Sequence, residues 1–147
     1  MDNLQIKILG KEINLRKLPL KLWCGLELLR KKMDDAISKR DFDNYYAYTV
    51  QTIEMASISL PKINWEEVPW IEIAQAQNAV VVLNNVTKDF PILRGSGQEE
   101  KVQPWEYDGR SWFFWLNLFA SNYGWNESII AEMDVDTAIG LYQEITI

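Results

Sequence analysis

The residues that could support metal or phosphate chemistry are few, and each group lacks a part that its chemistry requires. Asp134 and Asp136 are spaced like the first two ligands of a calcium loop, but no glycine follows at the sixth position and no glutamate at the twelfth. Two helix caps explain both carboxylates. Gly95-Ser96-Gly97 lacks the lysine and the helix start of a phosphate loop, so a flexible linker explains it better. We expect no metal site and no cofactor.

Nucleophilic and acid–base catalysis are excluded on similar grounds. The chain has no histidine, which removes Ser-His-Asp and Cys-His catalysis and the commonest general base at neutral pH. Cys24 is the only cysteine, which fits a reducing compartment, and we interpret it as a small packing residue. The acid pair Glu66-Glu67 fits a helix N-terminus, and Glu99-Glu100 fits a soluble linker. The sequence therefore predicts a protein that is not an enzyme.

Aromatic side chains near the C-terminus are better candidates, for binding rather than for catalysis. Residues 105–147 contain four of the seven tryptophans. A module this small buries so much aromatic surface with difficulty, and Trp and Tyr dominate interface hot spots. We expect Trp115, Leu116 and Phe119 to form the small core of this module. The candidate partner-binding residues are Trp105, Trp112, Phe113, Tyr123 and Trp125.

The balance of charge changes in the same region. Residues 1–93 carry 12 basic and 12 acidic side chains, residues 94–104 carry two of each, and residues 105–147 carry one arginine against seven acids. An abrupt change of this kind indicates two modules, 1–93 and 105–147, joined by a linker at 94–104.

The charge and hydropathy patterns also limit the classes of partner. Binding to phosphates needs clustered cations, and the acidic module would be repelled, so we expect no nucleic-acid partner. No apolar run reaches the length of a membrane helix, and the N-terminus lacks the pattern of a signal peptide. We therefore expect a soluble, cytoplasmic protein with no membrane partner.

The first half of the chain predicts a hairpin followed by helices. Alternating residues at 4–8 and 13–15, around Gly10, predict a β-hairpin that needs helices to cover one face. Pro19 predicts the start of a helix. The apolar stripe of that helix is Leu22, Leu26, Leu29, Met33 and Ile37.

Two more helices follow before residue 85. Asp41 predicts the cap of a helix. The apolar side of that helix is Phe42, Tyr46, Val50 and Ile53. Asn64 with Glu67 resembles a capping box, and Pro69 opens a helix that ends at Asn84. The β-branched run at 80–82 leaves a strand as the alternative there.

The C-terminal module predicts three short helices. The first is aromatic and ends at Gly124, the second is capped by Asn126, and the third is capped by Asp134 or Asp136. The residues expected to face inward on the last two are Ile129, Ile130, Met133, Ala138, Ile139, Tyr142 and Ile145. The expected fold class is mainly α: an N-terminal β-hairpin packed on a small helical domain, a flexible linker, and a small three-helix C-terminal module.

The end of the chain also resembles a known family. The stretch 109–115, followed by Tyr123-Gly124-Trp125, a capping residue and an acidic and apolar helix start, resembles the frameshift-appended part of tail assembly chaperones of long-tailed bacteriophages. Gly10-Lys11-Glu12 and the stretch 18–23 are similar to the beginning of the same family. Asn126 stands where Ser or Thr is commoner, and these residues are equivalent as helix caps.

The resemblance implies a non-catalytic function in virion assembly. Module 1–93 would coat the long helical tape-measure protein, and module 105–147 would recruit tail tube subunits that later displace the chaperone. It implies the long, frameshifted form, located in the cytoplasm of the bacterial host and missing from the mature virion. Self-association through the apolar surface of the free protein is a further expectation.

Two other functions remain open. One is a minor structural or adaptor protein of a phage tail or tail-like particle, permanently incorporated. The other is a regulator or inhibitor whose acidic C-terminal module mimics an acidic ligand.

Overall fold

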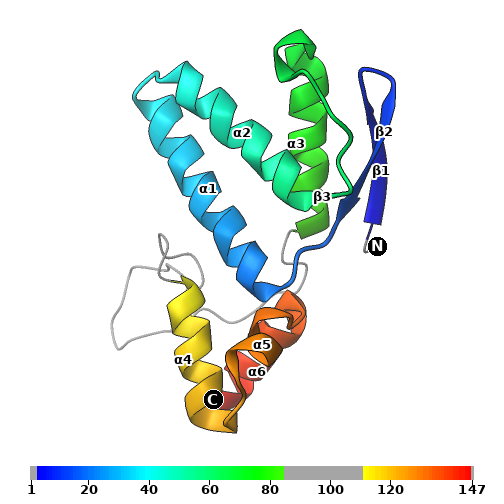
Figure 1. Ribbon diagram of the computed structural model, residues 1–147. Helices are drawn as coiled ribbons and strands as arrows, with labels where there is room; N and C mark the ends of the chain where they lie inside the picture. The colour runs from blue at the N-terminus through cyan, green and yellow to red at the C-terminus, as the bar shows by residue number, and fades with distance from the viewer. Residues whose placement is uncertain (1–2, 85–110, 147) are drawn as a thin grey trace. The chain divides into compact units, whose positions relative to one another are not determined.

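The computed structural model of the protein describes residues 3–84 and 111–146 (Figure 1). The fold is mainly helical, with a three-stranded antiparallel sheet near the N-terminus, which confirms the expected fold class. The described residues fall into two compact units. Unit 1 comprises residues 3–17 and 29–84, and unit 2 comprises residues 18–28 and 111–146. The expected linker at 94–104 lies outside the described residues.

The sheet of unit 1 begins with the expected hairpin. Strands β1 (Asn3–Ile8) and β2 (Lys11–Arg16) pair antiparallel, with Ile6 opposite Ile13. The two turn residues have positive φ, 51° at Leu9 and 75° at Gly10, which matches the twist of a two-residue hairpin. A short third strand, β3 (Ser57–Ile58), pairs with β2 opposite Leu15 and was not predicted.

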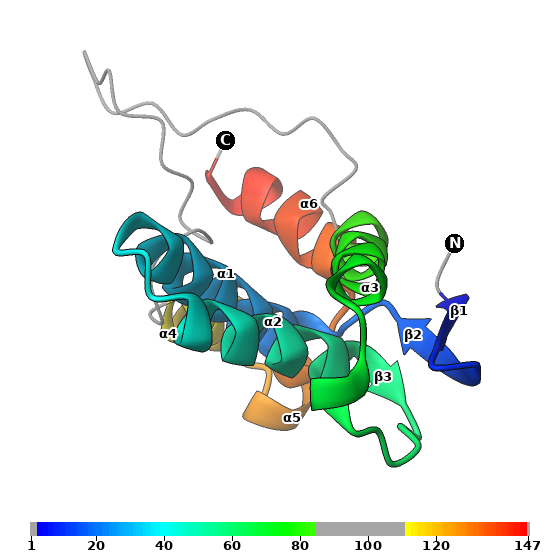
Figure 2. The same ribbon diagram turned by 90° about the horizontal axis from the view of Figure 1, so that it is seen from above.

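Three helices belong wholly or partly to unit 1. These are α1 (Leu20–Ser38), α2 (Phe42–Ala56) and α3 (Trp70–Asn84), with a 3-10 turn η1 (Trp65–Glu67) before α3. Helix α3 packs against both the sheet and α2 (Figures 1 and 2). The α2–α3 contact includes a hydrogen bond from the Thr52 hydroxyl to the Gln77 side-chain carbonyl. Residues 80–82 are helical, so the alternative of a strand there is wrong.

The core of unit 1 joins the sheet to the helices. Its fully buried members include Ile8, Ile13, Leu15, Ile53, Ile73 and Val80. The α1 stripe is buried at Leu26, Leu29 and Met33, but Ile37 is exposed, and so is Phe42 at the start of α2. Both exposed residues flank the turn between α1 and α2, where a helix end has solvent on one side. The expected stripes were therefore too long by one residue each.

Capping explains where α2 begins and why no helix begins at Asn64. The Asp41 carboxylate accepts the backbone N–H of Asn44 at 3.3 Å and its side-chain amide at 2.6 Å, as expected. The Asn64 side chain makes no cap hydrogen bond, so the capping box is wrong. The segment stops after one 3-10 turn because Pro69 favours an extended Val68 (φ −78°, ψ 124°).

Asp41→Ala is expected to lower the free energy of unfolding by about 1 kcal/mol, because the first turn of α2 loses a side-chain acceptor. Asp43→Ala is the control, since Asp43 lies in the same first turn and is not the N-cap; its loss should cost only a few tenths of a kcal/mol through the helix dipole. Urea denaturation followed by circular dichroism measures both. Equal effects of the two substitutions would contradict the capping assignment.

Unit 2 contains the C-terminal helices and the beginning of α1. Helices α4 (Ser111–Tyr123), α5 (Glu127–Ala131) and α6 (Val135–Thr146) follow in order. The backbone N–H of Leu20 donates to the carbonyl of Met133 at 2.8 Å. The sequence-based division assigned all of residues 1–93 to one module, whereas the structure groups residues 18–28 with the C-terminal helices.

The composition of α1 explains this grouping. Leu20, Trp23 and Cys24 are buried although they lie outside the expected stripe. A helix that is apolar on more than one face is buried on more than one face. The start of α1 therefore contributes to the core of unit 2, and Cys24 is one of the buried residues there.

Candidate functional site

The core of unit 2 is a cluster of aromatic rings. Trp115 and Phe119 of α4 are fully buried and stacked, with ring centroids 5.7 Å apart. Tyr142 of α6 meets Trp115 edge-on at 5.8 Å, and burial raises the pKa of its phenol. The expected core residues Trp115 and Phe119 are confirmed, while Leu116 is only partly buried.

A second pair of rings continues this cluster towards the surface. Tyr123 and Trp125 are stacked with centroids 4.5 Å apart and an interplanar angle of 21°. Both contact the buried Phe119, at 6.1 and 5.9 Å. Tyr123 remains 39% exposed, and Trp125 is partly buried. We call Tyr123 and Trp125 the aromatic stack.

Local backbone signals place the aromatic stack. Gly124 has φ +68°, and its N–H donates to the Ala120 carbonyl at 3.0 Å, so α4 ends there and the chain turns back. The turn brings Trp125 over the last turn of α4. Asn126 then caps α5 by accepting the N–H of Ile129 at 3.0 Å. A glycine and a cap therefore hold the stack on Phe119.

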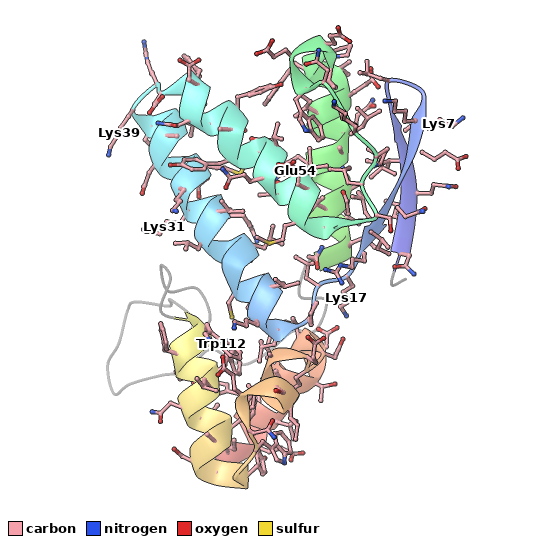
Figure 3. The ribbon with its side chains drawn as sticks, in the orientation of Figure 1. Lys7, Lys17, Lys31, Lys39, Glu54 and Trp112 are labelled. Carbon is pink, nitrogen blue, oxygen red and sulfur yellow. The ribbon has the colours of Figure 1, made fainter. Side chains whose placement is uncertain are left out.

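Trp112 takes part in a contact inside unit 2. The Lys21 ammonium lies 5.4 Å from the centroid of the Trp112 ring and 3.4 Å from a carboxylate oxygen of Glu127. Trp112 lies in the first turn of α4 (Figure 3) and is partly buried. The ion pair is exposed and contributes little stability, but the cation–π contact occupies one face of the indole. Trp112 is therefore less accessible to a partner than the sequence suggested.

The remaining candidates lie apart from the aromatic stack. Phe113 is 67% exposed and makes no ring contact with another described residue. Trp105 lies outside the described residues. Of the five candidates, the structure thus brings together Tyr123 and Trp125.

Helix α5 corrects one inward assignment. Ile130 is fully buried, Met133 is partly buried, and Ile129 is exposed. A helix of five residues can bury only one narrow face, which Ile130 occupies. Ile129 therefore adds apolar surface to unit 2 instead of filling its core.

The Asp134 carboxylate has a structural partner in Thr137. Asp134 accepts the N–H of Thr137 at 3.1 Å and its hydroxyl at 3.3 Å, so Asp134 is the residue that caps α6. Within residues 3–84 and 111–146, no three His, Cys, Asp or Glu side chains are grouped closely enough to hold a metal ion.

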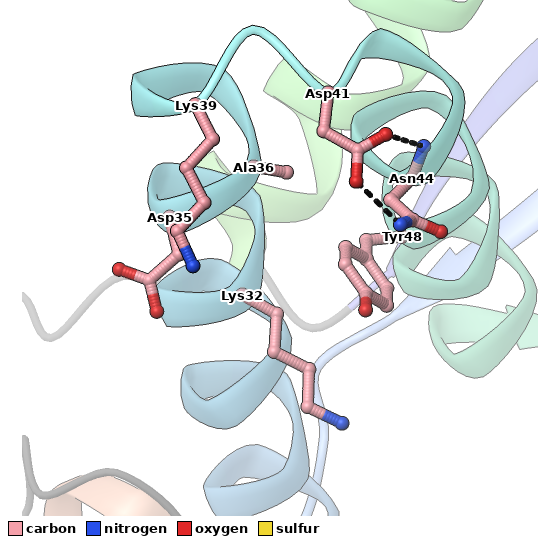
Figure 4. Close-up of a pocket in the computed structure, with 7 residues that line it drawn as sticks. All are labelled: Lys32, Asp35, Ala36, Lys39, Asp41, Asn44 and Tyr48. Carbon is pink, nitrogen blue, oxygen red and sulfur yellow. Dashed lines mark hydrogen bonds between the residues drawn. The ribbon is translucent and has the colours of Figure 1, made fainter.

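Unit 1 has a pocket of about 260 Å³ between α1 and α2 (Figure 4). The residues that line it are Lys32, Asp35, Ala36, Lys39, Asp41, Asn44 and Tyr48. Its two lysines are matched by two acids. Lys32 lies 5.8 Å from the Tyr48 ring centroid, and the Asp41 carboxylate is engaged by Asn44. We interpret the pocket as a solvated junction between two helices.

Comparisons of this chain with protein-family models, with curated proteins and with solved structures give no significant match. No helix in the described part of the chain has both the length and the apolar character needed to cross a membrane.

Sequence reasoning missed two features that bear on binding. One is the contact of Lys21 with Trp112 and Glu127 in unit 2. The apolar residues Leu20 and Trp23 on either side of Lys21 are its signal in the sequence, because they indicate that the start of this helix is buried. The other is an exposed aromatic group on unit 1 that includes Tyr45 and Trp70, whose ring centroids are 6.0 Å apart. Aromatic residues one helical turn apart at 42, 45 and 46 are its signal in the sequence.

Proposed function

We propose that this protein is a tail assembly chaperone of a long-tailed bacteriophage and acts without catalysis in the cytoplasm of the bacterial host. In this proposal, unit 1 binds the tape-measure protein and keeps its apolar stripes apart. Unit 2 recruits tail tube subunits, which displace the chaperone as the tube grows.

The observation that carries the proposal is the aromatic stack. Tyr123-Gly124-Trp125 is the part of the sequence with the most specific resemblance to the chaperone family. In the structure these residues form a partly exposed pair seated on Phe119, rather than a buried core. An aromatic pair held in place on a buried ring loses little conformational entropy when a partner covers it.

The charge of unit 2 supports recruitment of a basic partner. Its described exposed acids include Glu127, Glu132 and Glu144. Such a surface steers a basic partner towards the aromatic anchors and accelerates association at low salt. In this proposal, burial of the aromatic stack provides most of the binding affinity, and the exposed acids of unit 2 increase the association rate constant.

Co-expression tests the proposal. The full chain, expressed with the tape-measure gene of the same phage, is expected to raise the soluble yield of the tape-measure protein. The full chain is the appropriate form, because a fragment 1–93 would contain residues 18–28 without the rest of unit 2. An unrelated acidic protein of similar size is the control. An unchanged soluble yield would contradict the chaperone function.

A further inference from the structure

Unit 1 presents a group of aromatic side chains between the starts of α2 and α3. We call Phe42, Tyr45, Tyr46 and Trp70 the aromatic patch. The Trp70 ring centroid lies 6.0 Å from that of Tyr45 and 6.4 Å from that of Tyr46. Phe42 precedes both tyrosines by one helical turn and so shares their face of α2. Phe42 is 60% exposed and Trp70 is 49% exposed.

The patch is fixed in place by the segment before α3. The Tyr46 hydroxyl donates to the Trp65 carbonyl at 2.6 Å, which ties η1 to α2. Burial, and then the negative charge of Glu66, raise the pKa of the Tyr46 phenol. Tyr46 therefore stays a neutral hydrogen-bond donor at physiological pH and holds the patch together. Phe42 and Trp70 are left as its exposed apolar surface.

Acidic side chains border the patch. Asp43 follows Phe42 in the first turn of α2, and Glu66 and Glu67 lie in η1. All three are exposed, and none forms an ion pair with another described residue. The cations Lys32 and Lys39 line the pocket between α1 and α2 (Figure 4). Asn44 and Tyr48 line the same pocket from α2, and they lie on the face of α2 opposite to the aromatic patch. Segments 40–46 and 65–70 thus carry three exposed acids against one exposed cation, Arg40, so the border of the apolar patch is net negative.

We propose that the aromatic patch binds an amphipathic helix whose apolar stripe is flanked by lysine or arginine. Aromatic side chains between two helices accept apolar residues at i, i+3, i+4 and i+7 of a helix, and the acidic border pairs with the flanking cations. The same border repels nucleic acid and acidic helices. The inference rests on the proposed function for the source of that helix, a segment of the tape-measure protein.

A designed peptide tests the patch without the tape-measure protein. The probe is a fluorescently labelled peptide of leucine and lysine with an amphipathic helical pattern, titrated with the full-length protein at low salt and followed by anisotropy. Phe42→Ala is expected to weaken binding about tenfold, because it removes an exposed anchor. The control is Val82→Ala, a 58% exposed apolar residue in the last turn of α3, which should bind like the wild type. A peptide of the same composition in scrambled order should bind weakly to all forms.

A pair of double variants separates the patch from general attraction to an acidic protein. Glu66→Gln with Glu67→Gln removes two charges beside the patch, and Glu132→Gln with Glu144→Gln removes two charges from unit 2. The first pair should weaken binding about threefold or more, and the second should change it little. Equal weakening by both pairs, or equal binding of the scrambled peptide, would overturn the proposal. Such a result would leave the co-expression test of the chaperone function unaffected.

Discussion

Trp115→Ala is expected to unfold unit 2, with a loss of about 3–5 kcal/mol in the free energy of unfolding. Trp115 is fully buried and contacts the rings of Phe114, Phe119 and Tyr142. The Phe119 ring also contacts three aromatic rings, those of Trp115, Tyr123 and Trp125, so loss of Trp115 also removes the ring on which the buried Phe119 stacks. Urea denaturation of the full chain, followed by circular dichroism and tryptophan fluorescence, measures the loss.

Phe113→Ala is the matched control, since Phe113 lies on the same helix and is largely exposed. Its removal should change the free energy of unfolding by about 0.5 kcal/mol or less. A larger loss for Phe113→Ala than for Trp115→Ala would mean that α4 turns its other face to the core.

Tyr123→Ala is expected to weaken binding to the tail tube subunit by about 30-fold, which corresponds to about 2 kcal/mol for a hot spot. The helical circular dichroism signal should remain, because Tyr123 is partly exposed at the end of α4. Tyr123→Phe keeps the ring and its stacking on Trp125, so it should bind nearly as well as the wild type. Isothermal titration calorimetry with purified tail tube subunit measures all three forms.

Trp125→Ala gives a second reading of the same anchor. This substitution should also weaken binding to the tail tube subunit. In a separate titration, added salt should weaken binding of the wild-type protein, because salt screens the acidic side chains of unit 2. Tyr123→Ala and Trp125→Ala could instead bind normally, or lose binding only by unfolding unit 2. Normal binding would show that these rings do not contact the partner, and loss of binding through unfolding would show that they serve the core of unit 2; either outcome would contradict a docking function.

Features decided within a few residues of the chain could be predicted from the sequence. The hairpin turn at Gly10, the caps Asp41 and Asn126 and the helix end at Gly124 each depend on local backbone chemistry. The capping box at Asn64 failed for an equally local reason, because Pro69 restricts the residue before it.

Features decided by packing between distant segments could not be predicted. The pairing of β3 with β2 and the burial of Leu20 against the C-terminal helices depend on tertiary contacts. The same holds for the candidate site. The sequence named Tyr123 and Trp125, but their stacking on Phe119 and the contact of Trp112 with Lys21 depend on the folded arrangement.

The most direct test of the chaperone function is the location of the protein during and after assembly. Quantitative mass spectrometry should be applied to infected cells before lysis and to particles purified from the same culture. A chaperone is expected to be abundant in the infected cells, to co-purify with the tape-measure protein, and to be missing from the purified particles. Retention in the particles at a fixed ratio to the tape-measure protein would contradict this function and indicate a minor structural or adaptor protein of the tail.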